Sequence, residues 1–193
     1  MRFFSLFILF LISIGNSFAI AQNDTTSQSG FRVAGISVAY AGENIIRPGF
    51  FMAADMPLMQ NRRGEIWLSP GITFFSFQPF YSAWLGGVRA TYKYKLGESF
   101  SFRPITLAVH YKHKFLSAQV YEEINDSVQK IKDNGYGNLH VLAASGLEYS
   151  FSKEGILPLS VFTDFGISAE PYFSVFRFHW ELYFGVRYNI IRE

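Results

Sequence analysis

The sequence predicts an all-β protein in which eight antiparallel strands close into an up-and-down transmembrane β-barrel. Three observations carry this prediction. Hydrophobicity alternates with period two along most of the chain after Gly30, which is typical of strands. Aromatic residues make up 19% of the chain, more than its 17% of charged residues. After the N-terminal segment, no apolar run reaches the about 18 residues of a membrane-spanning helix.

The N-terminal segment, residues 1–21, is predicted to be a secretory signal peptide. A single basic residue precedes the apolar run FFSLFILFLISI, and Ala19 and Ala21 form the small-x-small pattern of a cleavage site. The run is shorter than the roughly 20 residues of a spanning helix, which disfavours a membrane anchor. Residues 22–30 are polar and are expected to form a flexible lead-in, and residues 31–193 are assigned to the barrel.

Charge, cysteine content and motifs exclude several function classes. Removal of the signal leaves 16 of the 17 Lys and Arg against all 15 Asp and Glu, a net charge of +1. This balance is not the basic footprint of a nucleic-acid-binding protein, so no nucleic-acid partner is expected. The chain has no cysteine, so neither a disulfide nor a lipid-attachment cysteine is available. Four scattered histidines and the lack of catalytic motifs predict no metal and no cofactor.

The strands are separated by Gly-, Asn-, Pro- or charge-rich connections. The predicted strands are residues 31–41, 46–57, 64–77, 80–96, 100–120, 137–151, 156–170 and 173–191. The second, fourth and sixth connections are compact, whereas the fifth, residues 121–138, is by far the longest. Such unequal ends are typical of a barrel with one rim of short turns and one rim of loops. In the fifth connection, a turn of helix in EEINDSVQKIKD is the alternative to a solvated loop.

Apolar and polar residues also alternate in the later predicted strands, which supports each of these assignments. In residues 82–96, rings and aliphatic side chains alternate with Arg, Thr and Lys; in 104–115 they alternate with Thr, His and Lys. In residues 157–170 the polar partners are Ser, Asp and Glu. The last strand contains RFHWELYFGVRYNI, where Arg, His, Glu and Asn hold odd positions and apolar residues hold even ones. Each strand therefore has one polar and one apolar face.

Volume indicates which face is inside. An eight-stranded barrel has an interior wide enough only for its own side chains or one small ligand, and the 22 Phe, 11 Tyr and 3 Trp would not fit there. Strands of about 11 residues or more, against a usual 5 or 6, match a bilayer crossing. The apolar face is therefore predicted to contact lipid. A soluble lipocalin-like carrier, with the apolar face inward, is the competing architecture.

The polar face is assigned to a salt-bridged lumen, because buried charges must be paired and both signs occur in similar numbers. The predicted lumen charge network is Arg89, Lys93, His110, Lys112, His140, Glu148, Asp164, Arg177, His179, Glu181 and Arg187. The predicted lipid-facing and girdle residues are Trp84, Tyr92, Tyr94, Tyr111, Phe178, Trp180, Phe184 and Tyr188. In the last hairpin, strand parity places Asp164 opposite Arg177 or His179.

The final strand LYFGVRYNI resembles the C-terminal strand that barrel-assembly machinery recognises. Over residues 31–191 the pattern resembles the small eight-stranded outer-membrane β-barrels of Gram-negative bacteria, the OmpA/OmpX-like group, and NIIRPGFFMAADMPL is similar to the second strand of such barrels. One departure is that residues 190–193 follow Tyr188, whereas such chains commonly end on an aromatic residue. The resemblance implies location in the outer membrane, with membrane lipid and barrel-assembly machinery as partners.

The expected role is structural or surface-interacting, without an open pore and without enzymatic activity. A lipid-modifying enzyme, of the lipid A deacylase or acyltransferase type known among such barrels, is the first alternative. Its candidate residues would be His113, Ser117 and Glu122, but positions 113 and 117 of one strand lie about 13 Å apart at roughly 3.3 Å per residue. The soluble lipocalin-like carrier is the second alternative. Any surface ligand is expected at the 121–138 loop, and its nature is unknown.

Overall fold

The computed structural model describes residues 32–44, 46–61, 63–78, 80–116, 120–124, 127–131, 134–151, 157–172 and 175–190. The predicted signal peptide and polar lead-in lie outside these residues, as does the tail at 191–193. Among the described residues, no helix is long and apolar enough to cross a membrane.

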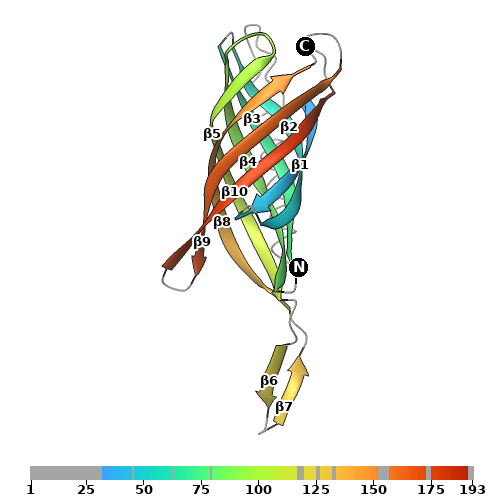
Figure 1. Ribbon diagram of the computed structural model, residues 1–193, viewed down its shortest axis with the longest axis vertical. Helices are drawn as coiled ribbons and strands as arrows, with labels where there is room; N and C mark the ends of the chain where they lie inside the picture. The colour runs from blue at the N-terminus through green and yellow to red at the C-terminus, as the bar shows by residue number, and fades with distance from the viewer. Residues whose placement is uncertain are drawn as a thin grey trace, which may run out of the picture.

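Eight antiparallel strands form a closed barrel, as the sequence predicts (Figure 1). The barrel strands are β1 (Gly35–Glu43), β2 (Arg47–Gln60), β3 (Gly64–Phe77), β4 (Tyr81–Lys95), β5 (Phe100–Leu116), β8 (Tyr136–Ser150), β9 (Leu159–Tyr172) and β10 (Val175–Asn189). Each strand pairs with its sequence neighbours in the barrel, and β1 closes the barrel against β10. Closure leaves no strand edge unpaired, which is the condition for a sheet to survive in lipid.

The fifth connection contains a β-hairpin, so the expectation of a solvated loop or a turn of helix was wrong. Strands β6 (Val120–Ile124) and β7 (Ser127–Ile131) pair antiparallel as a separate two-stranded sheet. The sequence VYEEI-ND-SVQKI has two short β-prone runs around an Asn-Asp pair, a hairpin signal that the surrounding charges obscured. The hairpin belongs to the connection between the end of β5 and the start of β8.

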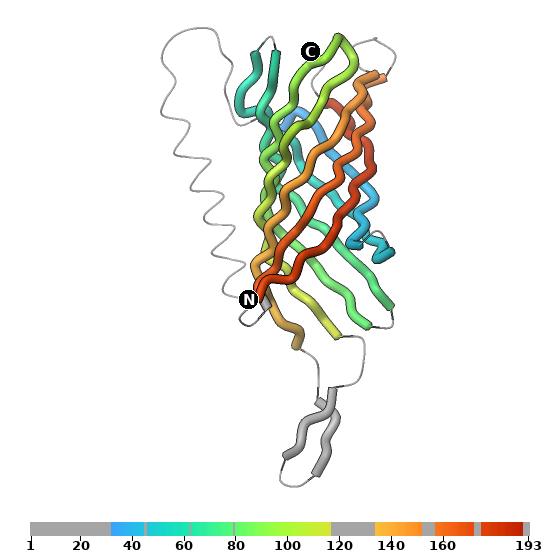
Figure 2. The backbone as a smooth tube through the Cα atoms, turned by 60° about the vertical axis from the view of Figure 1, so that its left-hand side comes forward, coloured from blue at the N-terminus to red at the C-terminus, as the bar shows by residue number. Residues whose placement is uncertain are grey.

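The two ends of the barrel are distinguished by their connections. One end, here called the hairpin end, carries the connections β1–β2, β3–β4, β5–β8 and β9–β10. The opposite end, here called the terminal end, carries the other three connections, the start of β1 and the end of β10. The strands run steeply between these ends and tilt around the barrel axis (Figure 2).

Burial alternates along the barrel strands. In β5, Leu107 is 50% exposed and the next residue, Ala108, is 1% exposed. Val109 and Tyr111 are exposed, and His110 between them is buried. The exposed face is therefore apolar and the enclosed face carries the charges, which is the reverse of a lipocalin-like barrel.

Glycines on the inner face bring neighbouring strands close together. A Cβ at Gly87 would lie 2.2 Å from the carbonyl oxygen of Val109, and one at Gly146 would lie 1.8 Å from that of Thr163. A Cβ at Gly86, on the outer face, would meet nothing within 4 Å. The inner glycines therefore leave the narrow lumen free for long charged side chains.

Candidate functional site in the barrel lumen

The structure places most of the predicted lumen residues inside the barrel. The buried ones are Arg89, Lys93, His110, Lys112, His140, Glu148, Asp164, Glu181 and Arg187. His179 is half-buried near the hairpin end, and Arg177 is exposed.

Arg177 corrects the predicted network. It lies near the tip of the β9–β10 hairpin, where its register partner is Glu170, and its side chain is exposed. The predicted partner of Asp164 was also wrong, because Asp164 lies opposite Tyr183. The expected turn was at Glu170-Pro171, but β9 continues through Pro171, so the turn falls later in the chain and shifts the register.

A terminal-side cluster of ion pairs fills the lumen toward the terminal end. Its carboxylates are Glu65, Glu148 and Asp164, and its cations are Lys93, Lys95, Arg103 and Arg187. Glu148 is its centre: Lys93 Nζ lies 2.8 Å from Glu148 Oε2, and the Arg187 guanidinium binds Glu148 Oε1. Arg103 lies 3.7 Å from the same carboxylate and 3.0 Å from Asp164. One carboxylate is therefore shared by three cations.

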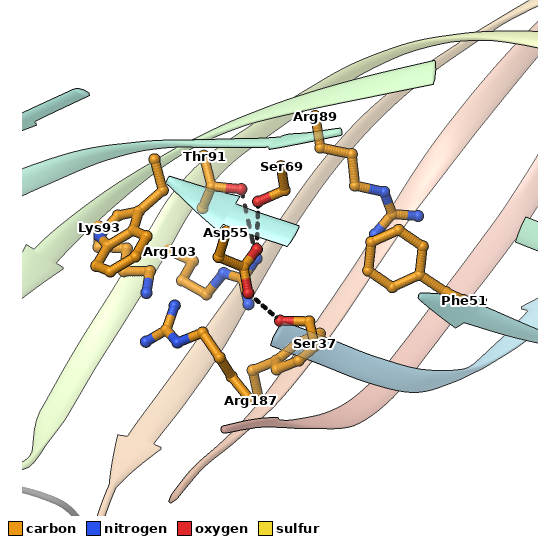
Figure 3. A pocket seen from close by; sticks show the side chains of 11 residues that line it. Ser37, Phe51, Asp55, Ser69, Arg89, Thr91, Lys93, Arg103 and Arg187 are labelled. Carbon is orange, nitrogen blue, oxygen red and sulfur yellow. Dashed lines mark hydrogen bonds between the residues drawn. The ribbon is translucent and has the colours of Figure 1, made fainter. Parts of the chain in front are cut away.

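Aromatic rings and hydroxyls support this cluster. The indole of Trp67 lies beneath both Lys93 Nζ (4.3 Å) and the Arg187 guanidinium (4.5 Å), and it donates a 2.7 Å hydrogen bond to Glu65. The carboxylate of Asp55 accepts hydrogen bonds from Ser37 and Ser69 (Figure 3). Cation–π contact partly replaces the water that these buried cations have lost.

A hairpin-side cluster fills the opposite half of the lumen. Its carboxylates are Glu43, Glu170 and Glu181, and its cations are Arg47, Lys112 and Lys114. Lys112 Nζ lies 2.5 Å from Glu43 and 3.4 Å from Glu170, so it bridges two carboxylates. Tyr81 donates a 2.5 Å hydrogen bond to Glu43. Glu43 and Glu170 are thus paired with lysine or arginine, whereas His140 contacts Glu181.

Two histidines and a tyrosine surround Glu181. A carboxylate can only accept, so His140 Nε2 donates the 2.7 Å hydrogen bond to Glu181, and Tyr183 donates another at 2.5 Å. His110 Nδ1 lies 3.3 Å from His140 Nδ1. A histidine oriented by a carboxylate is also the arrangement of a general base. Here all four side chains are at most 3% exposed, which leaves a substrate no access to them.

Glu43, Glu170 and His179 bring one ligand atom each to within 4.8 Å of one another, close enough for a metal ion. The cations Lys112 and Lys114 already contact these carboxylates, at 2.5 Å from Glu43 and 3.8 Å from Glu170. His179 Nε2 donates to Glu170 at 2.8 Å. Lys112 and Lys114 already supply positive charge to these carboxylates, so the group forms an ion-paired cluster.

The predicted lipid-facing rings lie on the outer face. Trp84, Tyr94, Tyr111, Phe178, Trp180, Phe184 and Tyr188 are exposed, and Tyr92 is half-exposed. Trp180 stacks on Phe165, with ring centres 5.4 Å apart and an interplanar angle of 7°. This face is apolar over most of its height, as contact with lipid tails requires.

Of the three candidate residues for a lipid-modifying enzyme, the structure describes only the side chain of His113. His113 Nε2 lies 3.2 Å from the backbone oxygen of Asn134. Ser117 and the side chain of Glu122 lie outside the described residues.

Sequence reasoning missed residues that hold the lumen together. Arg103 was missed because a β-bulge between Arg103 and Thr106 puts an odd and an even residue on the same inner face. Phe51, Trp67 and Tyr183 were missed because rings were expected to face lipid, yet these three are buried against cations. These three rings stand at odd positions, as the charged residues of the same strands do, and this shared alternation could have placed them in the lumen.

No protein-family profile matches the sequence, and no curated protein matches it either. Among solved structures, the chain is similar to Neisserial surface protein A (NspA), with a TM-score of 0.50, 11% identity, and coverage of 81% of this chain and 94% of that one. This likeness shows the fold alone. Matches with lower TM-scores include the attachment invasion locus protein Ail of Yersinia pestis (TM-score 0.48, 13% identity, 80% and 97% covered) and the outer membrane enzyme PagL (0.46, 10%, 81% and 100%).

Proposed function

We propose that this chain is exported by its N-terminal signal and folds as an integral barrel in the outer membrane of a Gram-negative bacterium, with a structural or surface-interaction role. One observation carries the proposal: a closed eight-stranded barrel exposes apolar side chains and encloses paired charges. In water this arrangement would expose a large apolar surface, whereas in lipid it is the favourable one. The strand pattern supports the outer membrane in particular, because spanning barrels belong to that membrane.

We further propose that the barrel does not conduct. Salt bridges, rings and buried aliphatic side chains fill the lumen between the two clusters. An eight-stranded barrel has no volume left over for a water-filled channel. In planar bilayers the purified barrel is expected to show no stable conductance steps, and steady ion current through single barrels would overturn this part of the proposal.

The hairpin end is the proposed outer surface, and the terminal end is proposed to face the periplasm. Both barrel termini lie at the terminal end, and the longest connection, with the β6–β7 hairpin, lies at the other. Membrane barrels place their longer loops outside. The other three connections at the hairpin end span only two or three residues, so the β5–β8 connection alone supports this orientation. A surface ligand would therefore meet the hairpin end. Membrane lipid and barrel-assembly machinery are the other proposed partners.

Fractionation and gel migration test the proposal. The mature chain is expected in the outer-membrane fraction, soluble only with detergent, and to migrate differently before and after boiling. A chain that stays soluble without detergent would contradict it. The mass of lipid A in cells that express the barrel checks the non-enzymatic role. Unchanged lipid A is expected, and loss or gain of an acyl chain would instead indicate a lipid-modifying enzyme.

A further inference from the structure

Asn44 ties the β1–β2 connection to β10 at the hairpin end. The pairing of β1 with β10 stops at Glu43 and Glu181, and Asn44 is the next residue of the chain. Its backbone N–H donates to the Trp180 oxygen at 2.5 Å, and its side-chain Oδ1 accepts from the Trp180 N–H at 3.1 Å. Its φ of 50° is one that asparagine adopts more readily than most residues. Asn44 therefore extends the seam between the first and last strands, partly through its side chain.

The amide nitrogen of Asn44 faces a histidine. Asn44 Nδ2 lies 3.3 Å from His179 Nδ1, and the other ring nitrogen, His179 Nε2, lies 2.8 Å from Glu170 Oε1. The His179 side chain is 11% exposed, so water has limited access to it. The Asn44 side chain is therefore held between the backbone of Trp180 on one side and the imidazole of His179 on the other.

These contacts specify the protonation state of His179. A carboxylate only accepts hydrogen bonds, so His179 Nε2 carries the proton that Glu170 accepts. The Trp180 N–H only donates, so the Asn44 oxygen faces it and the Asn44 NH2 group faces His179 Nδ1. Because that NH2 group needs an acceptor, Nδ1 carries no proton. This arrangement therefore requires a neutral His179 with its proton on Nε2.

A second proton on His179 would put two donors against each other. The Nδ1–H would face the NH2 group of Asn44, and no hydrogen bond can form between them. Turning the Asn44 amide over would offer its oxygen to His179 but would place its NH2 group against the Trp180 N–H. In both orientations Asn44 loses one of its two side-chain hydrogen bonds. Histidine is the side chain that ordinarily gains this proton between about pH 5 and 8.

Charges of both signs surround this histidine. Beyond Glu170 on β9, they are Glu43 on β1, Arg47 on β2, and Lys112 and Lys114 on β5. Glu43 Oε1 lies 4.0 Å from His179 Nε2, and Lys112 and Lys114 approach Glu170 to 3.4 Å and 3.8 Å. The two carboxylates favour a second proton on the ring, and the three cations oppose it. The surroundings therefore do not fix His179 in one charge state.

We propose that Asn44 and His179 form a proton-sensitive latch, which is closed while His179 is neutral and opens when the ring gains a second proton. In the closed state the latch holds the β1–β2 connection against β10. In the open state the seam loses a side-chain hydrogen bond at its hairpin end, while the pairing from Gly35 to Glu43 stays intact. With the hairpin end outward, as proposed above, the latch responds to the pH of the medium; the latch itself does not depend on that orientation.

Nitrogen NMR of the imidazole rings tests the latch in the unmodified mature barrel. At about pH 8, His179 is expected as the tautomer with its proton on Nε2, and loss of its signals in His179→Gln identifies them. On acidification to about pH 5, the protection of the Trp180 and Asn44 backbone amides against hydrogen exchange should fall about fivefold as His179 titrates, because one hydrogen bond is lost. A proton on Nδ1 at the higher pH, or unchanged protection throughout the titration, would overturn the proposal.

Asn44→Asp should reverse the sign of the response. A carboxylate at this position accepts from the Trp180 N–H and from a protonated His179 Nδ1, so protection should rise as the ring gains its proton. His113→Gln changes a histidine on the outer face; it is the matched control and should keep the fall seen in the unmodified chain. A fall of equal size in Asn44→Asp, or its loss in His113→Gln, would contradict the proposal. If Asn44→Asp does not fold, the measurements on the unmodified chain decide.

Discussion

The outer wall and the lumen of this barrel are made by the same strands, but different interactions hold their side chains. On the outer wall, exposed rings and aliphatic side chains need only to be apolar, because lipid tails accept any such shape. In the lumen, each charge depends on particular partners, as Glu148 does on Lys93, Arg103 and Arg187. A substitution should therefore have effects that depend on the face more than on the residue type.

The largest effect is expected for Glu148→Gln. This change leaves three buried cations without their shared carboxylate, and breaking a buried ion pair costs about 3–5 kcal/mol. Chemical denaturation in phospholipid vesicles measures the free energy of unfolding. Glu98→Gln, in the exposed β4–β5 connection, is the control and should change it by less than about 0.5 kcal/mol. Equal effects of both changes would remove the distinction between lumen and surface carboxylates.

A charge on the outer wall gives the next effect. Leu107 lies in the middle of β5 and is 50% exposed, so Leu107→Arg should cost about 2–4 kcal/mol in a bilayer. Leu96→Arg makes the same exchange in the β4–β5 connection at the terminal end, where about 0–1 kcal/mol is expected. The same denaturation experiment compares the two. A Leu107→Arg barrel as stable as the parent would mean that this face does not contact lipid tails.

Two adjacent glycines in β4 allow the same substitution to be compared on the outer face and on the inner face. Gly87→Ala puts a Cβ 2.2 Å from the backbone oxygen of Val109, so β4 and β5 must move apart, at a cost of about 1–3 kcal/mol. Gly86→Ala enters open space and should be neutral or stabilise by up to about 1 kcal/mol. Unfolding midpoints in denaturant distinguish the two variants. The reverse order would show that the lumen is wider than the structure indicates.

Removal of the β6–β7 hairpin should have the smallest effect. No barrel strand pairs with β6 or β7, so replacing residues 120–131 by a short Gly-Ser linker should change the free energy of unfolding by less than about 0.5 kcal/mol. Gel migration before and after boiling checks that the barrel still closes. A variant that no longer assembles would show that the hairpin takes part in barrel folding.

Strand alternation predicted the fold, because period two is imposed on every strand by the geometry of the backbone. The same parity predicted burial for residues in the middle of the strands, such as His140 and Glu181. It could not predict where a strand leaves the barrel, as at Arg177, or where a bulge reverses parity, as at Arg103. Those features depend on register and turn position, which pairing between strands determines.

Lumen partners were harder still to predict. Lys112 and Glu43 are 69 positions apart in the chain, and their contact follows only from closure of the barrel. Phe51 and Tyr183 enclose Arg89 although rings were expected outside, because a buried guanidinium can be solvated by aromatic faces. The sequence therefore indicated which charged residues lie in the lumen, but it did not indicate which residues they contact.

A labelling scan along β5 tests the central claim most directly. The chain has no cysteine, so single cysteines at positions 105 to 112 can each carry a fluorescent label in vesicles. Lipid-borne quenchers should reach labels at Ile105, Leu107, Val109 and Tyr111, and not those at Thr106, Ala108, His110 and Lys112. Quenching from lipid at the second set, or water-soluble quenchers reaching the first set in the middle of the strand, would contradict a membrane barrel with a charged lumen.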